Sequence, residues 1–340
     1  NNRIGMPLTL LDAPDDADFV VLEMGTNEPG EIGVLAQIAR PDIGVITTVG
    51  ESHLEKLGSL EGVLDEKLDI LRHLAEGGCC VVGDDPAVLA ERARALCPRV
   101  RVLGWSDRAD EADRPRHAEV DVFGRYTFEW KGQRASVPMV GKHAVSNALI
   151  ALAVAEKLGV SARDAVRGLS EADAGAMRGE FRRVGDLTLI VDCYNANPQS
   201  VRAALDVLAD QGVAARKVAV LGSMLELGDH ADELHDRVLA DTLQADLDIV
   251  VATGDFARAV ERSGLQSGAT VGRIQLLVAE SWQDAYPALA ARLHGDEIVL
   301  LKASRGIALE GMIPLLEADF GPDRIGATVE QDLGPRAVEV

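Results

Sequence analysis

The sequence predicts an α/β protein built from two series of alternating strands and helices, with a small antiparallel sheet between them. In both series, short runs of Val, Ile and Leu alternate with helix-like segments, first over 18–82 and again over 187–301. Between the two series, closely spaced runs over 120–139 are separated by turns that contain glycine. Interleaved strands and helices indicate parallel sheets covered by helices, whereas strands joined by short glycine turns indicate antiparallel pairing.

The expected strands are short apolar runs, rich in β-branched side chains, that end at polar or glycine-containing turns. The runs that precede residue 140 form the first series and the antiparallel part, and the runs that follow residue 186 form the second series. These expected strands cover 18–24, 43–49, 79–82, 120–123, 126–130, 133–139, 187–192, 216–222, 248–252 and 297–301.

The expected helices lie between these strands, where apolar residues recur at helical spacing. Over 144–158, for example, Val145, Leu149 and Leu152 share one face, and Gly159 is a stop signal for the helix. The other helices expected from the same pattern cover 30–39, 61–75 and 200–209.

The chain length of 340 residues suggests about two domains. A short region rich in Ala, Gly and charged residues separates the two series, so we place the boundary near residue 175. We therefore expect one domain at 1–175, a second at 176–320 and a poorly ordered tail at 321–340, where the periodicity is lost. The chain begins with N-N-R-I-G and has no initial Met, so we expect that its front is missing.

The charge balance excludes several classes of partner. Lys and Arg together number 34 and Asp and Glu number 55, which gives a net charge of −21. Nucleic acids and anionic membranes bind basic patches, so we expect neither as a partner. No run of about 18 apolar residues occurs, so no membrane span is expected. Four cysteines without a C-x-x-C pair favour reduced thiols in the cytoplasm: Cys79, Cys80, Cys97 and Cys193.

A run of polar residues, D-C-Y-N-A-N-P, follows the apolar segment 187–191 and precedes a helix-like stretch. In open α/β sheets, ligands bind at the carboxyl ends of strands and at helix N-termini. This placement predicts a binding site, although an ordinary polar turn between a strand and a helix remains an alternative. The candidate residues are Asp192, Tyr194, Asn195, Asn197 and Ser200.

Glu23 and His53 are candidate ligands for a divalent cation. Each comes at or just after the end of an expected strand, so both side chains should open on the same edge of the sheet. A carboxylate beside a glycine turn can bind a hard cation such as Mg²⁺. Taken singly, either residue is more often a surface or capping residue, whereas together they favour a metal site.

Two lysines have ordinary interpretations on spacing alone. Lys67 lies on an expected helix among acidic neighbours, which favours a solvent-exposed salt bridge. Lys142 follows Gly141 and precedes His143, so the segment is not a phosphate-binding loop, which requires Ser or Thr after Gly-Lys. No G-x-x-x-x-G-K-[ST] or G-x-G-x-x-G motif occurs in the chain. Asn147 lies off the apolar face of its helix and can meet a ligand or solvent.

Two further strands end in polar residues. The segment L-G-S-M-L-E-L-G at 221–228 contains Glu226 and runs into a helix that carries His235. The segment V-L-L-K-A-S-R-G at 299–306 ends with two cations and a hydroxyl group, which together suit an anion. Decoration of a helix start is the alternative for this second group, which comprises Lys302, Ser304 and Arg305.

Several segments in order along the chain resemble the Mur ligases. They are N-N-x-I-G-M-P-L-T-L-L, E-M-G-T-N-E-P-G-E-I, H-L-E-K-L-G-S-L-E-G-V, G-K-H-A-V-S-N-A-L, D-C-Y-N-A-N-P-Q-S, L-G-S-M-L-E-L-G and L-K-A-S-R-G, and they span residues 1 to about 310. The resemblance implies most of a central ATPase domain and all of a C-terminal Rossmann-like domain. The family's UDP-sugar-binding domain and phosphate loop would then lie before Asn1.

The resemblance also implies a reaction. The D-x-Y-N-A-N-P form is similar to that of the family member that joins D-alanyl-D-alanine to UDP-N-acetylmuramoyl-tripeptide. It implies ATP and Mg²⁺, an acyl phosphate on the substrate carboxylate, and attack by the amine of the dipeptide. Cytoplasmic synthesis of peptidoglycan precursors, and hence cell-wall growth, cell shape and division, follows from the same resemblance, as does a monomer.

Roles for single residues follow from the matching motifs. Glu23, His53 and a carbamylated Lys67 correspond to catalytic metal ligands, which replaces the ordinary interpretation of Lys67. Nucleotide contacts correspond to His143, Asn147, Arg178, Asp192, Tyr194 and Asn195. Substrate contacts are expected at Asn197, Ser200, Glu226, Lys302, Ser304 and Arg305.

Some departures and alternatives stay open at this stage. The family usually has Asp at Ser223, Gly at Ala303 and a second Asp at Val191. One alternative is a related ligase of the Mur or folylpolyglutamate type with another amino-acid substrate. Another is a non-catalytic remnant that lacks the phosphate loop. For the same reason, we expect the 340-residue chain alone to be inactive as a ligase.

Overall fold

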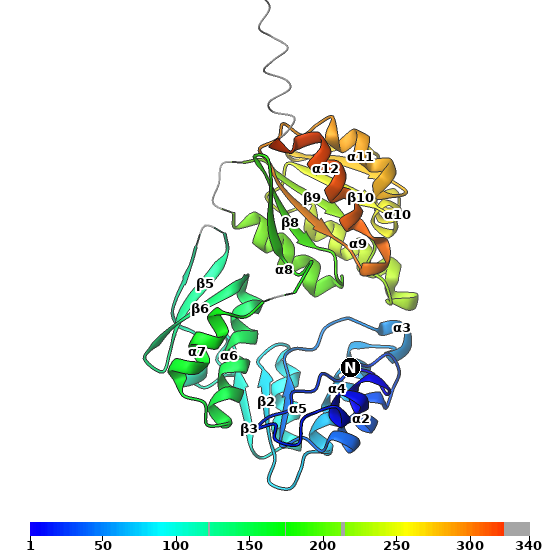
Figure 1. Ribbon diagram of the computed structural model, residues 1–340. Helices are drawn as coiled ribbons and strands as arrows, with labels where there is room; N and C mark the ends of the chain where they lie inside the picture. Colours follow the sequence, from blue (N-terminus) through cyan, green and yellow to red (C-terminus); the bar gives the residue numbers. More distant parts are fainter. Residues whose placement is uncertain (122, 174, 212–214, 323–340) are drawn as a thin grey trace, which may run out of the picture. The chain divides into compact units, whose positions relative to one another are not determined.

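The computed structural model describes residues 1–340 except 122, 174, 212–214 and 323–340, and it divides into two compact units (Figure 1). The first unit comprises Asn1–Asp173 together with the short segment Glu226–His230. The second unit comprises the rest of the chain. The expected tail at 321–340 lies, from residue 323 onward, outside the described residues.

A three-stranded parallel sheet forms the centre of the first unit. Its order is β1-β2-β3, with β1 at Ile43–Ile46, β2 at Cys79–Gly83 and β3 at Val100–Leu103. Every residue of β2 is buried, as expected for the middle strand of a covered parallel sheet. The helices of this part are α1 (Gly5–Leu11), α2 (Glu31–Ala39), α3 (Leu54–Leu57), α4 (Leu60–Arg72) and α5 (Ala87–Leu96), with a 3-10 turn η1 (Glu111–Asp113).

Helix α4 shows how the sequence determines a local element. Ser59 caps its N-terminus, because the Ser59 hydroxyl accepts a hydrogen bond from the Gly62 N–H at 3.1 Å. Val63, Leu64 and Leu68 are at most 1% exposed and form the buried face. Lys67 follows this buried face along the helix and is itself partly buried.

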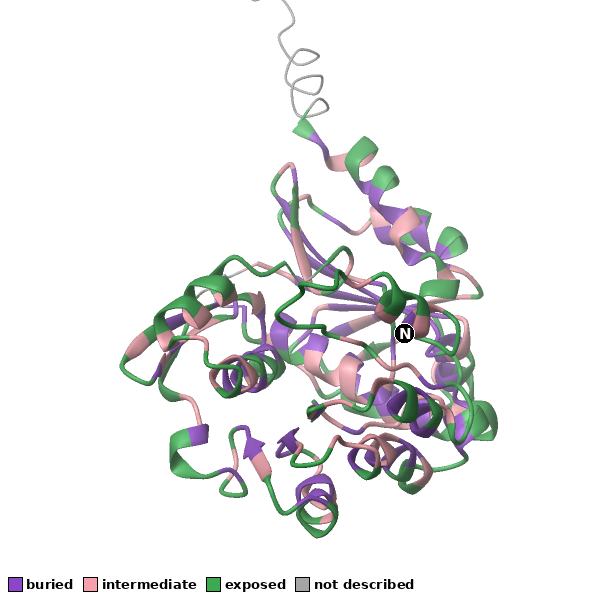
Figure 2. Cartoon of the chain, turned by 60° about the horizontal axis from the view of Figure 1, so that its bottom comes forward, coloured by how far each residue is buried: buried purple, intermediate pink, exposed green. Residues whose placement is uncertain are grey.

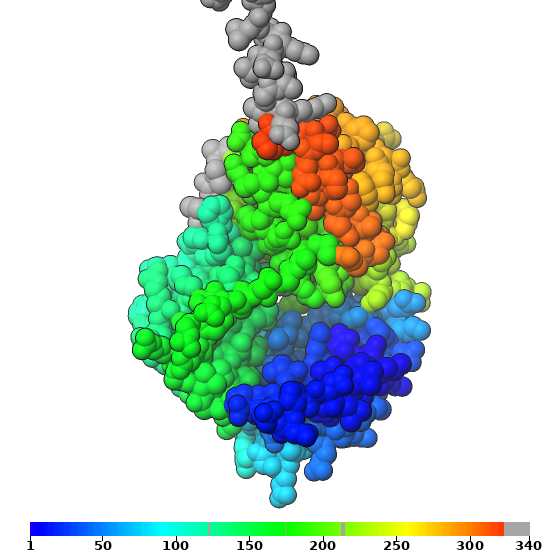
Figure 3. All heavy atoms as spheres, viewed as in Figure 1, coloured from blue at the N-terminus to red at the C-terminus, as the bar shows by residue number. Residues whose placement is uncertain are grey.

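The strand expected at 18–24 is not formed, and this prediction is wrong. Phe19, Val20 and Val21 are 52, 45 and 90% exposed, and the N-terminal residues, blue in Figure 3, lie on the molecular surface. A strand needs a neighbouring backbone to complete its hydrogen bonds. Within the described residues β1 pairs with β2 alone, and the segment 18–24 joins neither edge of the sheet. The apolar pattern of 18–24 was therefore not sufficient to form a strand.

The antiparallel sheet of the first unit has the order β4-β5-β6. Its strands are β4 (Arg116–Val120), β5 (Arg125–Trp130) and β6 (Gln133–Val140), and α6 (Lys142–Lys157) and α7 (Ala162–Ser170) pack against it. The first strand ends at Val120, so the expectation at 120–123 was placed too late, and residue 122 lies outside the described residues. Antiparallel pairing is confirmed.

The second unit is built on a seven-stranded sheet of order β11-β12-β10-β9-β13-β8-β7. The five inner strands are parallel, and β11 and β7 pair antiparallel at the edges. The α/β fold predicted from the sequence is confirmed. The strands are β7 (Glu180–Val184), β8 (Leu187–Asp192), β9 (Lys217–Leu221), β10 (Ile249–Thr253), β11 (Thr270–Val271), β12 (Ile274–Ala279) and β13 (Ile298–Lys302).

Helices cover both faces of this sheet, which explains why its inner strands are mostly apolar. Strands β9, β10 and β13 are buried along their whole length. Buried residues are purple in Figure 2, where several strands are purple throughout. Helices α8, α9 and α10 pack side by side, and α11, η4 and α12 cover the opposite face. The helices and 3-10 turns of the second unit are α8 (Pro198–Ala209), α9 (Ala231–Thr242), α10 (Asp255–Arg262), α11 (Trp282–Ala290), η3 (Arg305–Ile307), η4 (Leu309–Met312) and α12 (Ile313–Phe320). The 3-10 turn η2 (Gly228–His230) belongs to the first unit.

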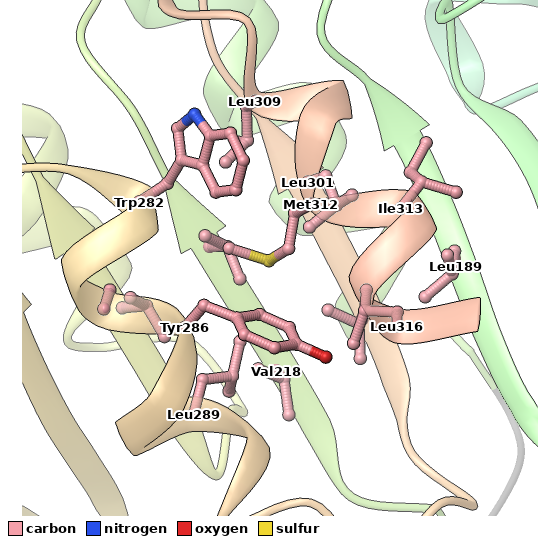
Figure 4. Close-up of a cluster of buried hydrophobic side chains, with 14 of the residues drawn as sticks. Leu189, Val218, Trp282, Tyr286, Leu289, Leu301, Leu309, Met312, Ile313 and Leu316 are labelled. Carbon is pink, nitrogen blue, oxygen red and sulfur yellow. The ribbon is translucent and has the colours of Figure 1, made fainter. Parts of the chain in front are cut away.

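Alternate residues of the strands point into the core under α11 and α12. Leu189 and Leu301 are fully buried there against Met312, and the rings of Trp282 and Tyr286 close the cluster (Figure 4). Two large aromatic rings in a chain with 4% aromatic residues contribute a disproportionate share of the buried area. This core supports the carboxyl ends of β8 and β13, where the polar motifs begin.

Candidate functional site

In the first unit, the structure brings Glu23 close enough to Lys67 for the two charges to interact. Lys67 is partly buried on α4, and this burial lowers the pKa of its amine. The carboxylates of Glu23 and Glu66 act in the opposite direction, but burial is the larger effect. A lowered pKa increases the fraction of neutral amine, which is the nucleophilic form of lysine.

Glu66, the residue before Lys67, was not among the residues singled out from the sequence. It is 5% exposed, and its carboxylate accepts hydrogen bonds from the Gly30 N–H at 2.6 Å and the Ile32 N–H at 2.8 Å. The Thr26 hydroxyl adds a third hydrogen bond at 3.2 Å. An acid three residues after the buried Val63 was a sequence signal for this role, since it lies on the apolar face of the helix.

A second carboxylate holds the same loop from its other side. Glu31 accepts hydrogen bonds from the backbone N–H groups of Asn27 at 2.6 Å and Glu28 at 3.0 Å. The hydrogen bond from Asn27 is the main cause of the lowered pKa of Glu31. The loop that follows Glu23 is therefore tied at four backbone N–H groups by two carboxylates.

His53 lies just before α3 in a left-handed conformation, with φ at 55°. Its Nδ1 lies 2.7 Å from Oε2 of Glu226, which belongs to the same unit. The Glu226 carbonyl oxygen also accepts the Glu55 N–H at 3.2 Å. A direct contact of His53 with Glu23 or Lys67 is not found within the described residues. The carboxylate on Nδ1 orients the imidazole and leaves Nε2 as the nitrogen that can bind a metal.

The donor types fit a hard divalent cation in part. Glu23 offers carboxylate oxygens and His53 an imidazole nitrogen, and Mg²⁺ prefers oxygen. Another group, His294, Asp296 and Glu297, has its ligand atoms within 4.8 Å of one another. Glu297, however, already accepts hydrogen bonds from the His294 and Gly295 N–H groups and pairs with Arg216. The Glu297 carboxylate of this second group is therefore already satisfied by the turn and by Arg216, which does not favour a metal site there.

His143 and Asn147 lie on exposed positions in the first turns of α6. The start of this helix is fixed by Trp105, whose indole N–H donates to the Lys142 carbonyl oxygen at 3.2 Å. The Trp105 ring is 37% exposed and meets Tyr126 edge-on at 5.8 Å. Sequence reasoning missed Trp105. Its position directly after a strand and a glycine was the available signal.

In the second unit, an ion pair joins the ends of β8 and β13. The Lys302 ammonium lies 3.0 Å from Oδ2 of Asp192 and is 1% exposed. It also donates to the backbone carbonyl oxygen of Asn195. Asn195 accepts the Ala196 N–H on its own side chain at 2.8 Å. The structure thus brings Asp192, Asn195 and Lys302 together, a meeting that the two motifs did not predict.

Tyr194 and Arg178 stack on each other in the same unit. The guanidinium of Arg178 lies 3.9 Å from the centre of the Tyr194 ring, and both side chains are exposed. The Tyr194 N–H donates to the Met177 carbonyl oxygen at 3.2 Å, which holds the segment before β7 beside the end of β8. A cation stacked on an aromatic face leaves its outer edge available to an anion.

Asn197 and Ser200 form a capping box at the start of α8. Oδ1 of Asn197 accepts the Ser200 N–H at 2.8 Å, and Oγ of Ser200 accepts the Asn197 N–H at 3.0 Å. Pro198 stands at the first helical position, where its missing N–H has no cost. Both polar side chains are therefore engaged in shaping the turn.

Ser304 and Arg305 differ in their surroundings. Ser304 is buried, accepts the Leu225 N–H at 3.0 Å and donates to the Ala196 carbonyl oxygen at 3.4 Å. It joins three loops at the carboxyl edge of the sheet. Arg305 has a side chain that is 57% exposed, 3.4 Å from Glu310 and 2.9 Å from the sulfur of Met177.

His235 lies fully buried on α9 behind this edge. Its Nε2 accepts the Met224 N–H at 3.0 Å, and Nδ1 lies 2.6 Å from the Ala231 carbonyl oxygen. These partners require the neutral ring with its proton on Nδ1. Burial, the largest effect, lowers the pKa of His235 and favours the same neutral form.

The three departures from the family pattern have structural roles. The Ser223 hydroxyl accepts the Asp255 N–H at 2.9 Å at the start of α10. Ala303 is fully buried against Gly222, and Val191 lies in the core under α11 and α12. An acid at Val191 would be buried among apolar side chains, so the valine suits its place in this sheet.

Two family models match the chain over most of its length. The Mur ligase middle domain matches residues 1–155, and the model described as Mur ligase, glutamate ligase domain matches residues 177–305. The chain belongs to the Mur ligase family. The family predicted from the sequence motifs is confirmed.

Relatives in several bacteria are similar to the chain. The UDP-N-acetylmuramoyl-tripeptide–D-alanyl-D-alanine ligase of Bacillus subtilis is 33% identical over 315 residues, which cover 92% of this chain and 67% of the relative. The ligase with the same name from Mycobacterium tuberculosis is 35% identical over 340 residues, 94% of this chain and 66% of the relative. The chain thus spans about two thirds of the length of these relatives.

A solved structure supports the same relationship. A MurF crystal structure from Acinetobacter baumannii superimposes with a TM-score of 0.82 at 29% identity, and the match covers 94% of this chain and 69% of that chain. Separately, within the described part of the chain, no helix combines the length and apolar character needed to cross a lipid bilayer.

Proposed function

We propose that this chain contributes to the reaction for which its relatives are named, the joining of D-alanyl-D-alanine to UDP-N-acetylmuramoyl-tripeptide. We further propose that ATP drives the reaction with Mg²⁺, that the protein works as a monomer in the cytoplasm, and that its product serves peptidoglycan synthesis. Residues 1–175 would act as the ATPase domain and 176–320 as the C-terminal domain. Relatives with this name match 92 to 94% of the chain, which supports the assignment.

The observation that carries the proposal is the partly buried Lys67 beside Glu23. Burial lowers the pKa of the Lys67 amine, and a neutral amine adds to CO₂ and releases one proton to solvent to give an anionic carbamate. The carbamate turns a cation into an anion with two oxygens. Together with the Glu23 carboxylate, it would form an oxygen-rich site for Mg²⁺, with His53 as a nitrogen ligand.

The bound metal would neutralise the charge of the reacting phosphate. The chain's own residues would then hold the other groups. In the first unit, the start of α6, with His143 and Asn147, is proposed to bind the adenine. Trp105 supports this role because it fixes the first turn of α6 through the Lys142 carbonyl oxygen.

In the second unit, the exposed pair of Arg178 and Tyr194 is proposed to meet the nucleotide, supported by Asp192 and Asn195. The exposed Arg305 guanidinium suits a substrate carboxylate, because its planar fork donates two parallel hydrogen bonds. Lys302 and Ser304 are buried and are proposed to shape this edge for the substrate. Asn197 and Ser200 would do the same through the cap of α8. In the first unit, Glu226 is proposed to take part in substrate binding through its hold on His53.

A ligase assay with the protein expressed from its complete gene tests the proposal. We expect release of phosphate that depends on UDP-N-acetylmuramoyl-tripeptide, D-alanyl-D-alanine and ATP together. Acceptance of single amino acids in place of the dipeptide would contradict the proposed substrate. The 340-residue chain alone should release no phosphate from ATP, because it lacks a phosphate-loop motif.

A further inference from the structure

The carboxylate of Glu66 is the most heavily engaged acid on α4. It is 5% exposed, and its two oxygens receive hydrogen bonds from Gly30 N–H, Ile32 N–H and the Thr26 hydroxyl. A buried carboxylate is costly unless such partners satisfy it. The contacts therefore define one arrangement of the loop on the helix, because another arrangement would leave the charge unpaired.

The loop that Glu66 holds follows Glu23 directly. Thr26 is three residues after Glu23 and is 7% exposed, and its hydroxyl lies 3.1 Å from the Glu28 carbonyl oxygen as well as near Glu66. Lys67 is the next residue after Glu66 on α4. One carboxylate thus ties the segment that carries Glu23 to the helix that carries Lys67.

We propose that Glu66 is a positioning residue that fixes Glu23 beside Lys67 by holding the loop 26–32 on helix α4. The role rests on the proposed function to the extent that Glu23 and Lys67 form the metal site. Glu66 itself need not touch metal or substrate, since its oxygens are already occupied by the loop.

A simpler role would be to cap α2. Gly30 occupies the N-cap position and offers no side chain, so the Glu66 carboxylate replaces the missing cap at Gly30 and Ile32. A pure cap would affect the stability of α2 but not the distance between Glu23 and Lys67. Metal affinity separates the two roles, because it depends on where Glu23 lies.

The first measurement is backbone hydrogen exchange in the unaltered chain and in Glu66→Gln and Glu66→Ala. Glu61→Gln is the matched control, since Glu61 lies on the same helix in an exposed ion pair with Arg92. We expect amides in 26–32 to exchange about tenfold faster or more in Glu66→Ala, because each lost bond to a charged acceptor is worth at least that factor. Glu66→Gln keeps one oxygen acceptor, so its exchange rates should lie between those of the unaltered chain and those of Glu66→Ala.

The second measurement is the affinity for Mn²⁺, by electron paramagnetic resonance in bicarbonate buffer. We expect about tenfold weaker binding or more in Glu66→Ala, a smaller loss in Glu66→Gln and no change in Glu61→Gln, in line with losses seen when supporting residues are removed. Circular dichroism establishes that each variant is folded. If Glu66→Ala does not fold, Glu66→Gln decides the result.

The outcomes separate the positioning role from the proposed function. Faster exchange with unaltered Mn²⁺ affinity would reduce Glu66 to a cap and overturn the positioning role alone. Unaltered exchange of the amides in 26–32 in Glu66→Ala would show that Glu66 does not hold the loop on α4. If the unaltered protein binds no Mn²⁺, the proposed metal site is wrong, and the positioning role fails with it whatever the exchange rates are.

Discussion

The Lys302 ammonium and the Asp192 carboxylate lie 3.0 Å apart, at positions that pair directly in register between the neighbouring strands β13 and β8. Lys302 is 1% exposed, so its charge is almost fully removed from water. The pair therefore closes the carboxyl edge of the sheet between two motifs that are more than 100 residues apart in the chain. Removal of either side chain would leave the other charge without its partner, which destabilises the folded chain.

Loss of one partner should therefore be costly. In Lys302→Met, Asp192 loses its cation while Asn195 loses the donor to its carbonyl oxygen. We expect the free energy of unfolding to fall by about 2 to 4 kcal/mol, below the highest values for buried pairs because Asp192 keeps some solvent contact. Urea unfolding measures the change. Arg305→Ala, which breaks the exposed pair with Glu310, should cost about 1 kcal/mol or less, and equal losses would contradict the prediction.

The buried His235 predicts a dependence of stability on pH. Its pKa in the folded chain lies below the value of about 6.5 for an ordinary histidine. Above pH 6.5 both states are neutral, so the contribution is constant. As pH falls below 6.5, the unfolded chain binds a proton that the folded ring resists, and stability is lost until the folded pKa is reached.

Thermal unfolding of the second unit between pH 5 and 8 tests this dependence. In His235→Gln, a side-chain oxygen replaces Nε2 as the acceptor for the Met224 N–H without a titratable group. We expect its midpoint to change less between pH 7 and 5 than that of the unaltered chain. If the midpoint of unfolding falls equally with pH in both proteins, groups other than His235 cause the dependence of stability on pH.

Two glycines should respond in opposite directions to alanine. Gly254 has φ at 59° and ψ at −123°, and an added Cβ would overlap the Ser223 hydroxyl. We expect Gly254→Ala to destabilise the second unit by about 2 kcal/mol or more. Gly168 lies on an exposed position of α7 with nothing near an added Cβ, so Gly168→Ala should stabilise the first unit by about 0.5 to 1 kcal/mol. The transition of each unit in scanning calorimetry gives the two values.

Lys67 should acquire a carbamate. With ¹³C-bicarbonate, we expect a carbamate resonance in the chain that is absent from Lys67→Ala, and stronger at higher pH because only the neutral amine reacts. In the protein from the complete gene, Lys67→Ala should lower turnover about 100-fold or more, with partial rescue by short carboxylates. Unchanged turnover would return Lys67 to an ordinary surface role. Lys56→Ala is the control, because its exposed side chain lies 4.0 Å from Glu28.

Part of the fold was predictable because an apolar run along the chain indicates a strand that is buried on both faces. The expected strands at 187–192 and 297–301 match β8 and β13 within one residue, since both faces of the sheet are buried and the runs are apolar throughout. The run at 18–24 has a similar composition but forms no strand, because pairing depends on a neighbouring backbone that the sequence pattern does not show.

By itself, the sequence determined the family, the α/β class and several of the strands, such as those at 187–192 and 297–301, whereas it did not predict β3, β7, β11 and β12. Only the tertiary structure decided which polar residues meet. It paired His53 with Glu226, buried Glu66 under the loop after Glu23, and joined Lys302 to Asp192. Composition and periodicity describe neighbours along the chain, whereas a hydrogen bond or an ion pair depends on distance in space and on exclusion of water.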